Sequence, residues 1–309
     1  MKLEDTTKRV IKMFKDELES YVNSNPRLVA MKPAGEGIYV LKYKKRVFYD
    51  GLWNRFVAEC RGSIVDVDFN LVSYPFTKIY NYGIEKEAPV LADDVKITAY
   101  RKINGFMVAV TWHNDDILVS TTGSTSGDYV AMAREMIEPH IERYRFTCEA
   151  YKGHTFMFEC VHKNDPHIIP EKEGMYLLGM RKNEFGSPII HEVGAMFLQM
   201  AFRSQPVEVY YTTVIELAKM VKSVKHEGFV FYTDDGVSAK IKSPYYLTSK
   251  WVARNPRTDK LVDLNKDIKH NLDEEYYGLV DAIRENIVQY TALDEQARLG
   301  WVRNYMEAL

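Results

Sequence analysis

The residue best suited to act as a nucleophile is Lys102, in the segment RKING at residues 101–105, which lies between apolar runs at 95–100 and 106–110. The pattern predicts a strand that ends near Lys102, then a turn at Gly105 and a second strand. A lysine held at such a turn can be desolvated, lose its proton and attack an electrophile. The glycine would let the backbone approach a phosphate or a sugar closely. An ordinary β-turn explains the same residues, so the segment alone leaves both interpretations open.

A single carboxylate, Glu159, interrupts the apolar run at residues 156–161. Burying a carboxylate in a strand is costly unless it binds a partner, and a sugar hydroxyl, a metal ion or a lysine would serve. An edge strand with Glu159 directed toward water is the alternative.

A second carboxylate, Glu227, stands beside Gly228 at the start of another apolar run, and Lys240 and Lys242 follow two residues apart. In a strand, residues two apart point to the same face. Their ammonium groups would repel each other, so a bound anion such as a triphosphate would explain the pair. A solvated strand face is the alternative explanation.

Two basic residues upstream are further candidates. Arg61 precedes Gly62 and an apolar run, and arginine suits bidentate contacts with phosphate, although a surface turn fits equally. Lys78 and Tyr80 lie in an aromatic stretch, residues 73–81, that suits stacking on bases or the edge of a core.

The chain of 309 residues has a formal net charge of −2, so any nucleic-acid surface must be a local patch. No apolar run reaches the roughly 20 residues of a membrane helix, and we expect no membrane partner. The N-terminus is charged, and the three cysteines, Cys60, Cys148 and Cys160, form no C-x-x-C pair. These features favour a cytoplasmic protein with reduced thiols and argue against a zinc site. Nothing implies an oligomer, so we expect a monomer.

Hydrophobic periodicity predicts elements along the whole chain. Val10, Phe14, Leu18 and Val22 form one stripe of a helix at residues 4–22. Asp234-Asp235-Gly236 predicts a hairpin turn, and polar residues 253–259 predict a domain boundary. The other predicted helices lie at 126–141, 212–222, 272–287 and 293–308, and predicted strands lie within 57–121 and at 145–150, 155–161, 175–180, 228–233 and 237–242.

Taken in chain order, these motifs resemble those of a known superfamily. The order is Glu-Cys-Arg-Gly at 59–62, Lys-x-Asn-Gly at 102–105, Glu159 between apolar residues, Glu-Gly at 227–228 and Lys-x-Lys at 240–242. It resembles the covalent nucleotidyltransferases, which include ATP-dependent ligases and capping enzymes. The Cys-Arg-Gly element and the Lys-Ile-Lys-Ser-x-Tyr ending are similar to phage tRNA-repair RNA ligases, the type 1 single-stranded RNA ligases, and to fungal tRNA ligases. The resemblance covers about residues 35–250.

The resemblance implies an α+β fold, with an antiparallel-sheet adenylyltransferase domain at residues 1–252 and a small helical domain at 253–309. It also implies an ATP-dependent RNA ligase that repairs RNA by joining 5′-phosphate and 3′-hydroxyl ends of single strands. ATP would be a substrate, and Mg²⁺ or Mn²⁺ a cofactor.

The resemblance further implies a role for each motif residue. Lys102 would attack the α-phosphate of ATP and form lysyl–AMP. Lys240 and Lys242 would contact that phosphate. Glu227 would help to bind the metal or orient the lysine, and Glu159 would be a second metal ligand. The implied nucleotide-binding residues are Arg61, Lys78, Tyr80, Gly105, Glu159, Gly228 and Val230.

The chain departs from the family pattern in three places. Asn104 stands where the commonest form has aspartate, and Thr122 where the phage enzyme has lysine. Only about 60 residues follow Lys242-Ser243, about half as many as in the phage enzyme, whose C-terminal domain favours broken tRNA. We therefore expect a ligase of single-stranded RNA ends without a commitment to tRNA.

Two other classes of protein remain open. A DNA ligase or a GTP-using capping enzyme usually carries a β-barrel after the last lysine motif, whereas this tail has a helical pattern. A non-catalytic RNA-binding relic would have lost an essential residue, and Lys102, Glu159, Glu227, Lys240 and Lys242 are all present.

Overall fold

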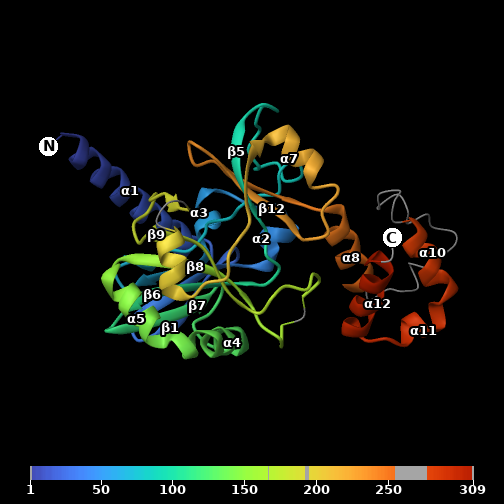
Figure 1. Ribbon diagram of the computed structural model, residues 1–309. Helices are drawn as coiled ribbons and strands as arrows, with labels where there is room; N and C mark the ends of the chain where they lie inside the picture. The colour runs from blue at the N-terminus through green and yellow to red at the C-terminus, as the bar shows by residue number, and fades with distance from the viewer. Residues whose placement is uncertain (1, 166, 192–194, 255–276, 308–309) are drawn as a thin grey trace. The chain divides into compact units, whose positions relative to one another are not determined.

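The computed structural model describes residues 2–165, 167–191, 195–254 and 277–307 (Figure 1). Contacts divide the chain into two compact units. The first unit comprises Met1–Tyr80, Gly105–Asp165 and Lys172–Val207, and the second comprises Asn81–Asn104, Pro166–Glu171 and Glu208–Leu309. Among the described residues, none of the helices is both long enough and apolar enough to cross a bilayer.

The first unit contains two antiparallel sheets. One has the order β1-β2-β3-β4 and the other the order β10-β9-β8-β6-β7. The first sheet consists of β1 Val29–Gly35, β2 Ile38–Tyr43, β3 Arg61–Asp66 and β4 Leu71–Ser73. The second consists of β6 Phe106–His113, β7 Asp116–Thr121, β8 His154–Val161, β9 Gly174–Lys182 and β10 Ile189–Ile190.

Helices cover both sheets of the first unit. Its helices are α1 Lys2–Ser24, α2 Lys45–Tyr49, α3 Arg55–Glu59, α4 Asp128–Ile137, α5 Ile141–Ala150 and α6 Ala195–Phe202. The ring centre of Phe202 lies 4.8 Å from that of Phe156 and 4.8 Å from that of Tyr144, so α6 packs against both α5 and β8. In α1, Leu18 and Val22 are buried as the stripe predicts, but Val10 is exposed.

The predicted strand at residues 145–150 is wrong, because these residues belong to α5. Tyr144, Thr147 and Cys148 lie three and four apart and bury one helical face, which is the spacing of a helix and not of a strand. The helix predicted over 126–141 is interrupted by a 3₁₀ turn at Glu138–His140, which contains Pro139.

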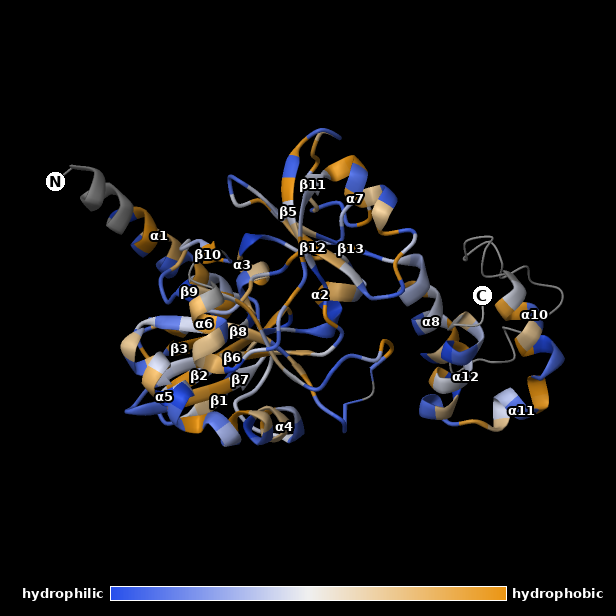
Figure 2. Cartoon of the chain, viewed as in Figure 1, coloured by the Kyte–Doolittle hydropathy of each residue, from blue (hydrophilic) through white to orange (hydrophobic). Residues whose placement is uncertain are grey.

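The second unit is built on an antiparallel sheet with the order β11-β5-β12-β13. The strands are β5 Lys96–Arg101, β11 Val209–Thr213, β12 Gly228–Thr233 and β13 Ser238–Lys242. Helix α7, Val214–Met220, covers the sheet through Val214 and Leu217. Figure 2 shows hydrophobic and hydrophilic residues mixed along α7, as expected of a helix with one buried face.

Beyond the sheet and α7, the described part of the second unit contains further helices. These are α8 Pro244–Arg254, α10 Tyr277–Glu285, α11 Ile287–Ala292 and α12 Glu295–Glu307. Leu279 and Ile283 of the predicted apolar face are fully buried in its core, whereas Leu272 and Tyr276 lie outside the described residues. The helical C-terminal region is thus confirmed. The domain boundary at 252/253 stays a prediction; it falls within α8, where both flanking residues are buried.

Two glycines shape the β12–β13 hairpin. Gly236 occupies the predicted turn with φ +84°, and a Cβ there would meet open space. Gly228 opens β12 with φ +129°, and a Cβ there would overlap the carbonyl oxygen of Ile241 on β13. Only glycine therefore permits the close approach of β12 and β13 at this end of the hairpin.

We predict that Gly228→Ala lowers the free energy of unfolding by roughly 3 kcal/mol, because it adds a backbone clash to an unfavourable φ. The matched variant Gly236→Ala keeps the strain without the clash and should cost only about 1 kcal/mol. Urea unfolding of both variants measures the difference. Equal losses would contradict the close approach seen at Gly228.

Candidate active site

In the second unit, Lys102 follows the last residue of β5, and sheet pairing fixes its position. Its backbone N–H donates to the carbonyl of Gly228 at 2.8 Å, and Arg101 pairs with Phe229 across β5 and β12. The start of β12 therefore lies beside Lys102, and the residue before Gly228 is Glu227. Residues 102 and 227, far apart in sequence, become neighbours through strand register.

The carboxylate of Glu227 is held by three partners and is only 3 % exposed. Its Oε2 lies 3.1 Å from the Nζ of Lys102, and its Oε1 lies 3.1 Å from the Nζ of Lys242. Burial raises the pKa of Glu227, but Lys102 and Lys242 more than offset this, so that its pKa lies below the ordinary value. The group is therefore an anion that two ammonium groups share.

The side chain of Asn104 supports this arrangement. Its Nδ2 donates to Oε2 of Glu227 at 2.8 Å, and its Oδ1 accepts from the backbone N–H of Ile169 at 2.9 Å. An amide can donate to one partner and accept from the other, whereas an ionised carboxylate can only accept. Asparagine thus fits the contacts that this chain makes at a position where the commonest form of the superfamily has aspartate.

The other lysine of the pair, Lys240, lies two residues before Lys242 on the same face of β13. It pairs across the hairpin with Val230, while Lys242 pairs with Gly228. The second unit therefore collects six of the predicted site residues: Lys102, Glu227, Gly228, Val230, Lys240 and Lys242.

Helix α8 adds two residues that the sequence analysis did not single out, Tyr246 and Lys250. The ammonium groups of Lys242 and Lys250 lie 4.7 Å and 5.7 Å from the centre of the Tyr246 ring. Burial lowers the pKa of Lys250, and Lys242 lowers it further. The sequence signal was the Ser-Pro pair after Lys242: Ser243 accepts the backbone N–H of Tyr246 at 3.1 Å, which starts a helix there and turns its next residues back toward Lys242.

In the first unit, Glu159 lies in β8, between β9 and β6, so the edge-strand alternative is excluded. Its Oε1 accepts the backbone N–H of Gly105 at 3.1 Å. A Cβ on Gly105 would overlap the carbonyl oxygen of Cys160, so glycine is required here too. Burial lowers the pKa of the Arg61 guanidinium, and the charges of Tyr43 and Glu159 oppose this. Arg61 is thus a charge partner of the buried Glu159.

Lys78 and Tyr80 also lie in the first unit, together with Trp53, which the sequence analysis missed. The Nζ of Lys78 is 4.8 Å from the Trp53 ring centre and 5.0 Å from that of Tyr80. Trp53 and Tyr80 meet edge to face at 6.2 Å. A cation between two rings is stabilised by their π faces.

A further lysine, Lys42 on β2, was also missed. Its side chain lies against Gly123 so closely that a Cβ there would overlap it, and its backbone pairs with Arg61. Gly123 follows Thr122, the position that lacks the family's lysine. The ammonium of Lys42 thus lies next to the turn at Thr122.

The residues present place limits on a metal site. Among the described residues, no group of three or more His, Cys, Asp or Glu side chains could hold a metal ion. Both oxygens of Glu227 already face ammonium groups. Mg²⁺ commonly takes only one or two carboxylates and is otherwise bound by substrate phosphates and water. The residues therefore fit a metal that arrives with a nucleotide rather than one in a protein cage.

Comparison with known proteins decides the family. A sequence profile described as RNA ligase matches residues 59–246, which span the motifs from Arg61 to Lys242. The chain belongs to the RNA ligase family. It is 22 % identical over 297 residues to an RNA ligase of Rhodothermus phage RM378, which covers 74 % of this chain and 67 % of that protein. The expectation of an RNA ligase is confirmed, which disfavours a DNA ligase or a capping enzyme.

Solved structures confirm the fold of this RNA ligase. A protein described as an ATP-dependent DNA ligase from Aquifex aeolicus is 14 % identical, with a TM-score of 0.54 over 93 % of this chain and 76 % of that chain. An archaeal ATP-dependent RNA ligase is also 14 % identical, with a TM-score of 0.52 over 92 % of this chain and 75 % of that chain. The predicted α+β ligase fold is thus confirmed.

We predict that Glu227→Gln destabilises the ligase by roughly 3 kcal/mol at neutral pH, because two mostly buried ammonium groups lose their counter-charge. The folded-state pKa of Glu227 lies below its ordinary value of 4.5, so its stabilisation is present above pH 4.5 and is lost as pH falls through the folded-state pKa. Wild-type stability should therefore fall more steeply with acidification than that of Glu227→Gln. Urea unfolding at several pH values measures this.

A matched control is Glu216→Gln, which removes an exposed carboxylate from α7 of the same unit. It should leave both the stability and its pH dependence close to wild type. Parallel acid profiles for wild type and Glu227→Gln would refute the buried ion-pair cluster.

Proposed function

We propose that this RNA ligase uses ATP to join a 5′-phosphate to a 3′-hydroxyl of RNA, with Lys102 as the nucleophile that carries AMP. The observation that supports this most directly is the cluster of Lys102 and Lys242 around the buried carboxylate of Glu227. It holds a nucleophile and a cation at fixed places at one end of the β5–β12–β13 sheet. Such a fixed array suits reaction at the phosphorus of a nucleotide.

The proposed reaction takes three steps. In the first, Nζ of Lys102 bonds to the α-phosphorus of ATP, the bond to the bridging oxygen breaks and pyrophosphate leaves with the electron pair. In the second, the 5′-phosphate of RNA displaces the lysine and gains AMP. In the third, the 3′-hydroxyl attacks that phosphate and AMP leaves. The AMP group converts a poor electrophile into one with a good leaving group.

The protonation of Lys102 is the main constraint on the first step. Only the neutral amine attacks, and the adjacent Glu227 carboxylate stabilises the ammonium form. Lys242 opposes this effect, since it shares the same carboxylate. The nitrogen must therefore give up one proton before the attack and a second during it. The proposed role of Lys242, with Lys240, is to meet the α-phosphate and stabilise the charge that develops there.

Residues of both units are proposed to bind the nucleotide. From the first unit the candidates are Arg61, Lys78, Tyr80, Gly105 and Glu159, and from the second Gly228 and Val230. Lys42 joins them, because its ammonium lies beside the turn where Thr122 replaces a lysine. A divalent cation, Mg²⁺ or Mn²⁺, would neutralise phosphate charge when bound, and Glu159 and Glu227 remain candidate ligands for it.

Other parts of the proposal rest on the sequence. The RNA is proposed to be single-stranded, and the protein to be a cytoplasmic monomer that takes part in RNA repair. The cysteines Cys60, Cys148 and Cys160 are all buried and free, which suits a reducing compartment. The division into an adenylyltransferase domain at 1–252 and a helical domain at 253–309 likewise stays a proposal.

The first test is protein labelling. Incubation with α-labelled ATP and Mg²⁺, followed by a denaturing gel, should show label on the wild-type protein. Lys102→Ala and Lys102→Arg should reduce it by at least roughly a thousandfold, because neither side chain supplies an attacking amine. Lys96→Ala, an exposed lysine on the same strand, is the matched control and should label normally. EDTA should prevent labelling by removing the metal.

The contradicting outcomes are distinct. Full labelling of Lys102→Ala would exclude Lys102 as the nucleophile. Labelling by α-labelled GTP alone would assign the protein to capping-type chemistry. Folded, unlabelled wild-type protein that still binds RNA would favour the non-catalytic relic.

We also predict that adenylylation accelerates with pH. While Lys102 is mostly protonated, the neutral fraction rises about tenfold per pH unit, and the rate should follow it. Single-turnover labelling at saturating ATP measures this. A rate independent of pH would show that deprotonation of Lys102 does not precede the attack.

A further inference from the structure

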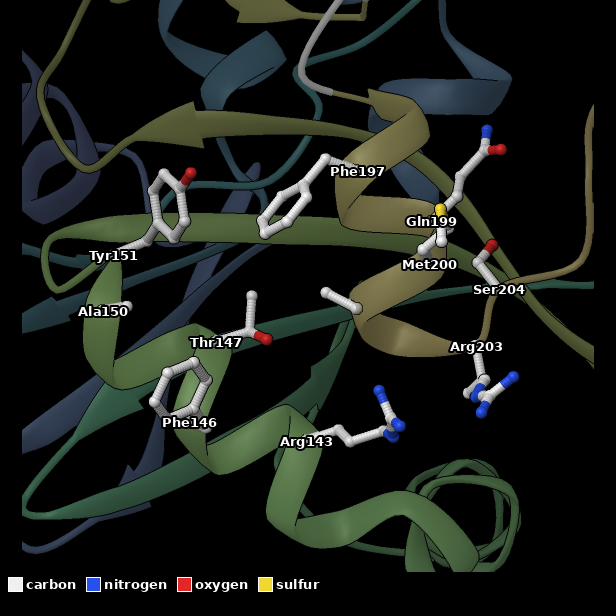
Figure 3. Close-up of a pocket in the computed structure, with 11 residues that line it drawn as sticks. Arg143, Phe146, Thr147, Ala150, Tyr151, Phe197, Gln199, Met200, Arg203 and Ser204 are labelled. Atoms are coloured by element: carbon white, nitrogen blue, oxygen red, sulfur yellow. The ribbon is translucent and has the colours of Figure 1, made fainter.

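The first unit carries an open groove between α5 and α6, with a volume of about 820 Å³ (Figure 3). None of the predicted site residues lines it. Its lining includes Arg143, Phe146, Tyr151, Phe197, Met200 and Arg203. Figure 3 shows Tyr151 toward one end of the groove and Arg143 and Arg203 toward the other.

The groove exposes large apolar side chains on both helices. Phe146 is 76 % exposed, Phe197 67 % and Met200 71 %. Tyr151 is a more fixed platform, because its ring packs edge to face on Phe156 at 5.9 Å. Large apolar side chains gathered around one groove indicate a binding surface, since scattered exposure would not place them together.

The charged residues that line the groove are all basic. Arg143 and Arg203 are both exposed, and none of the lining residues is acidic. On α5, residues 143, 147 and 150 share one side of the helix, whereas Glu142 and Glu149 project about a third of a turn away. Positive charge without opposing carboxylates favours an anionic occupant.

The backbone at Arg203 is a separate observation. Arg203 follows the last residue of α6 and has φ +55°. Its N–H donates to the carbonyl of Met200 at 3.3 Å, and the N–H of Ser204 donates to the carbonyl of Gln199 at 2.9 Å. This is the bond pattern of a helix end that normally uses glycine at the left-handed position. An arginine there is strained where glycine would not be, which points to a use for its guanidinium.

We propose that this groove binds a single-stranded stretch of the RNA that the ligase joins. Bases would stack on the rings of Tyr151, Phe146 and Phe197, and phosphates would meet Arg143 and Arg203. Aromatic platforms beside cations are what single-stranded nucleic acid requires, because every base has a π face and every linkage carries a charge. The inference rests on the RNA substrate of the family and adds a binding surface to the residues proposed for catalysis.

The test measures binding separately from catalysis. The probe is a fluorescein-labelled single-stranded RNA with a 5′-hydroxyl, which the enzyme cannot join, and anisotropy reports its affinity. Phe146→Ala with Phe197→Ala should weaken binding roughly a hundredfold, since each of the two rings would stack one base and each stacked base contributes about tenfold in affinity. Phe48→Ala, which removes another largely exposed phenylalanine, on α2, is the matched control and should bind like wild type.

The arginines give a different signature. Arg143→Ala with Arg203→Gly should weaken binding and also reduce the slope of log affinity against log salt, by roughly 0.7 for each lost phosphate contact. The aromatic pair should leave that slope unchanged. Arg145→Ala, on the same helix but paired with Asp116 and Glu142, is the control. Arg203→Gly alone should raise the melting temperature of the protein, because glycine relieves the backbone strain at this position. The same variant should bind RNA more weakly, because it lacks the guanidinium.

The outcomes separate this inference from the proposed function. Normal protein–AMP labelling with weakened RNA binding in the groove variants supports both. Unchanged RNA affinity in both double variants overturns the groove assignment. If wild-type protein self-associates on sedimentation and these variants do not, the groove binds a second copy of the chain. Unlabelled wild-type protein would refute the proposed ATP chemistry while the anisotropy result still decides the groove.

Discussion

The candidate site depends on the ion pairs that the buried carboxylate of Glu227 makes with Lys102 and Lys242. Alone, a carboxylate that is 3 % exposed would be strongly unfavourable, and so would two ammonium groups held against one side chain. Together they offset one another: Lys102 and Lys242 each lie 3.1 Å from one of its oxygens. Because the three residues follow β5, precede β12 and end β13, this cluster also fixes where those strands meet. Removal of the carboxylate would leave both ammonium groups uncompensated, so order at the site and stability of the sheet are coupled.

Small residues next to the charges make this geometry possible. Gly228, directly after Glu227, allows β12 to approach β13 so closely that a Cβ would overlap Ile241. Ser243, directly after Lys242, donates to the carbonyl of His226 and accepts the N–H of Tyr246, which ends the strand and begins α8. The helix then returns Tyr246 to within 4.7 Å of the Lys242 ammonium. The chain thus places a glycine and a helix cap directly after the residues that they position.

The family could be predicted from the sequence, because Lys102, Glu227 and Lys242 each stand in a short motif and the order of the motifs is typical of the family. Trp53, Lys42 and Lys250 could not be found this way, because their contacts arise only when a remote strand or helix brings them beside Lys78, Gly123 or Tyr246. The strand wrongly predicted at 145–150 has a related cause: Tyr144 and Cys148 of α5 share one core cluster with Leu198 and Phe202 of α6, and this packing partner is remote in the sequence.

The same carboxylate that orders the site opposes the proposed chemistry, and this tension suggests how ATP binding activates it. Lys102 and Lys242 are about four-fifths buried, so most of their desolvation is complete before a nucleotide arrives. A triphosphate that draws Lys242 away would therefore replace one ion pair with another at little further cost. Glu227 would then retain Lys102 and Asn104 alone, and the nucleophile would be held in place next to the phosphate while its proton departs. On the proposed mechanism the buried ion pairs would act as a preorganised phosphate site, which the protein's own carboxylate holds together until the substrate supplies its charge.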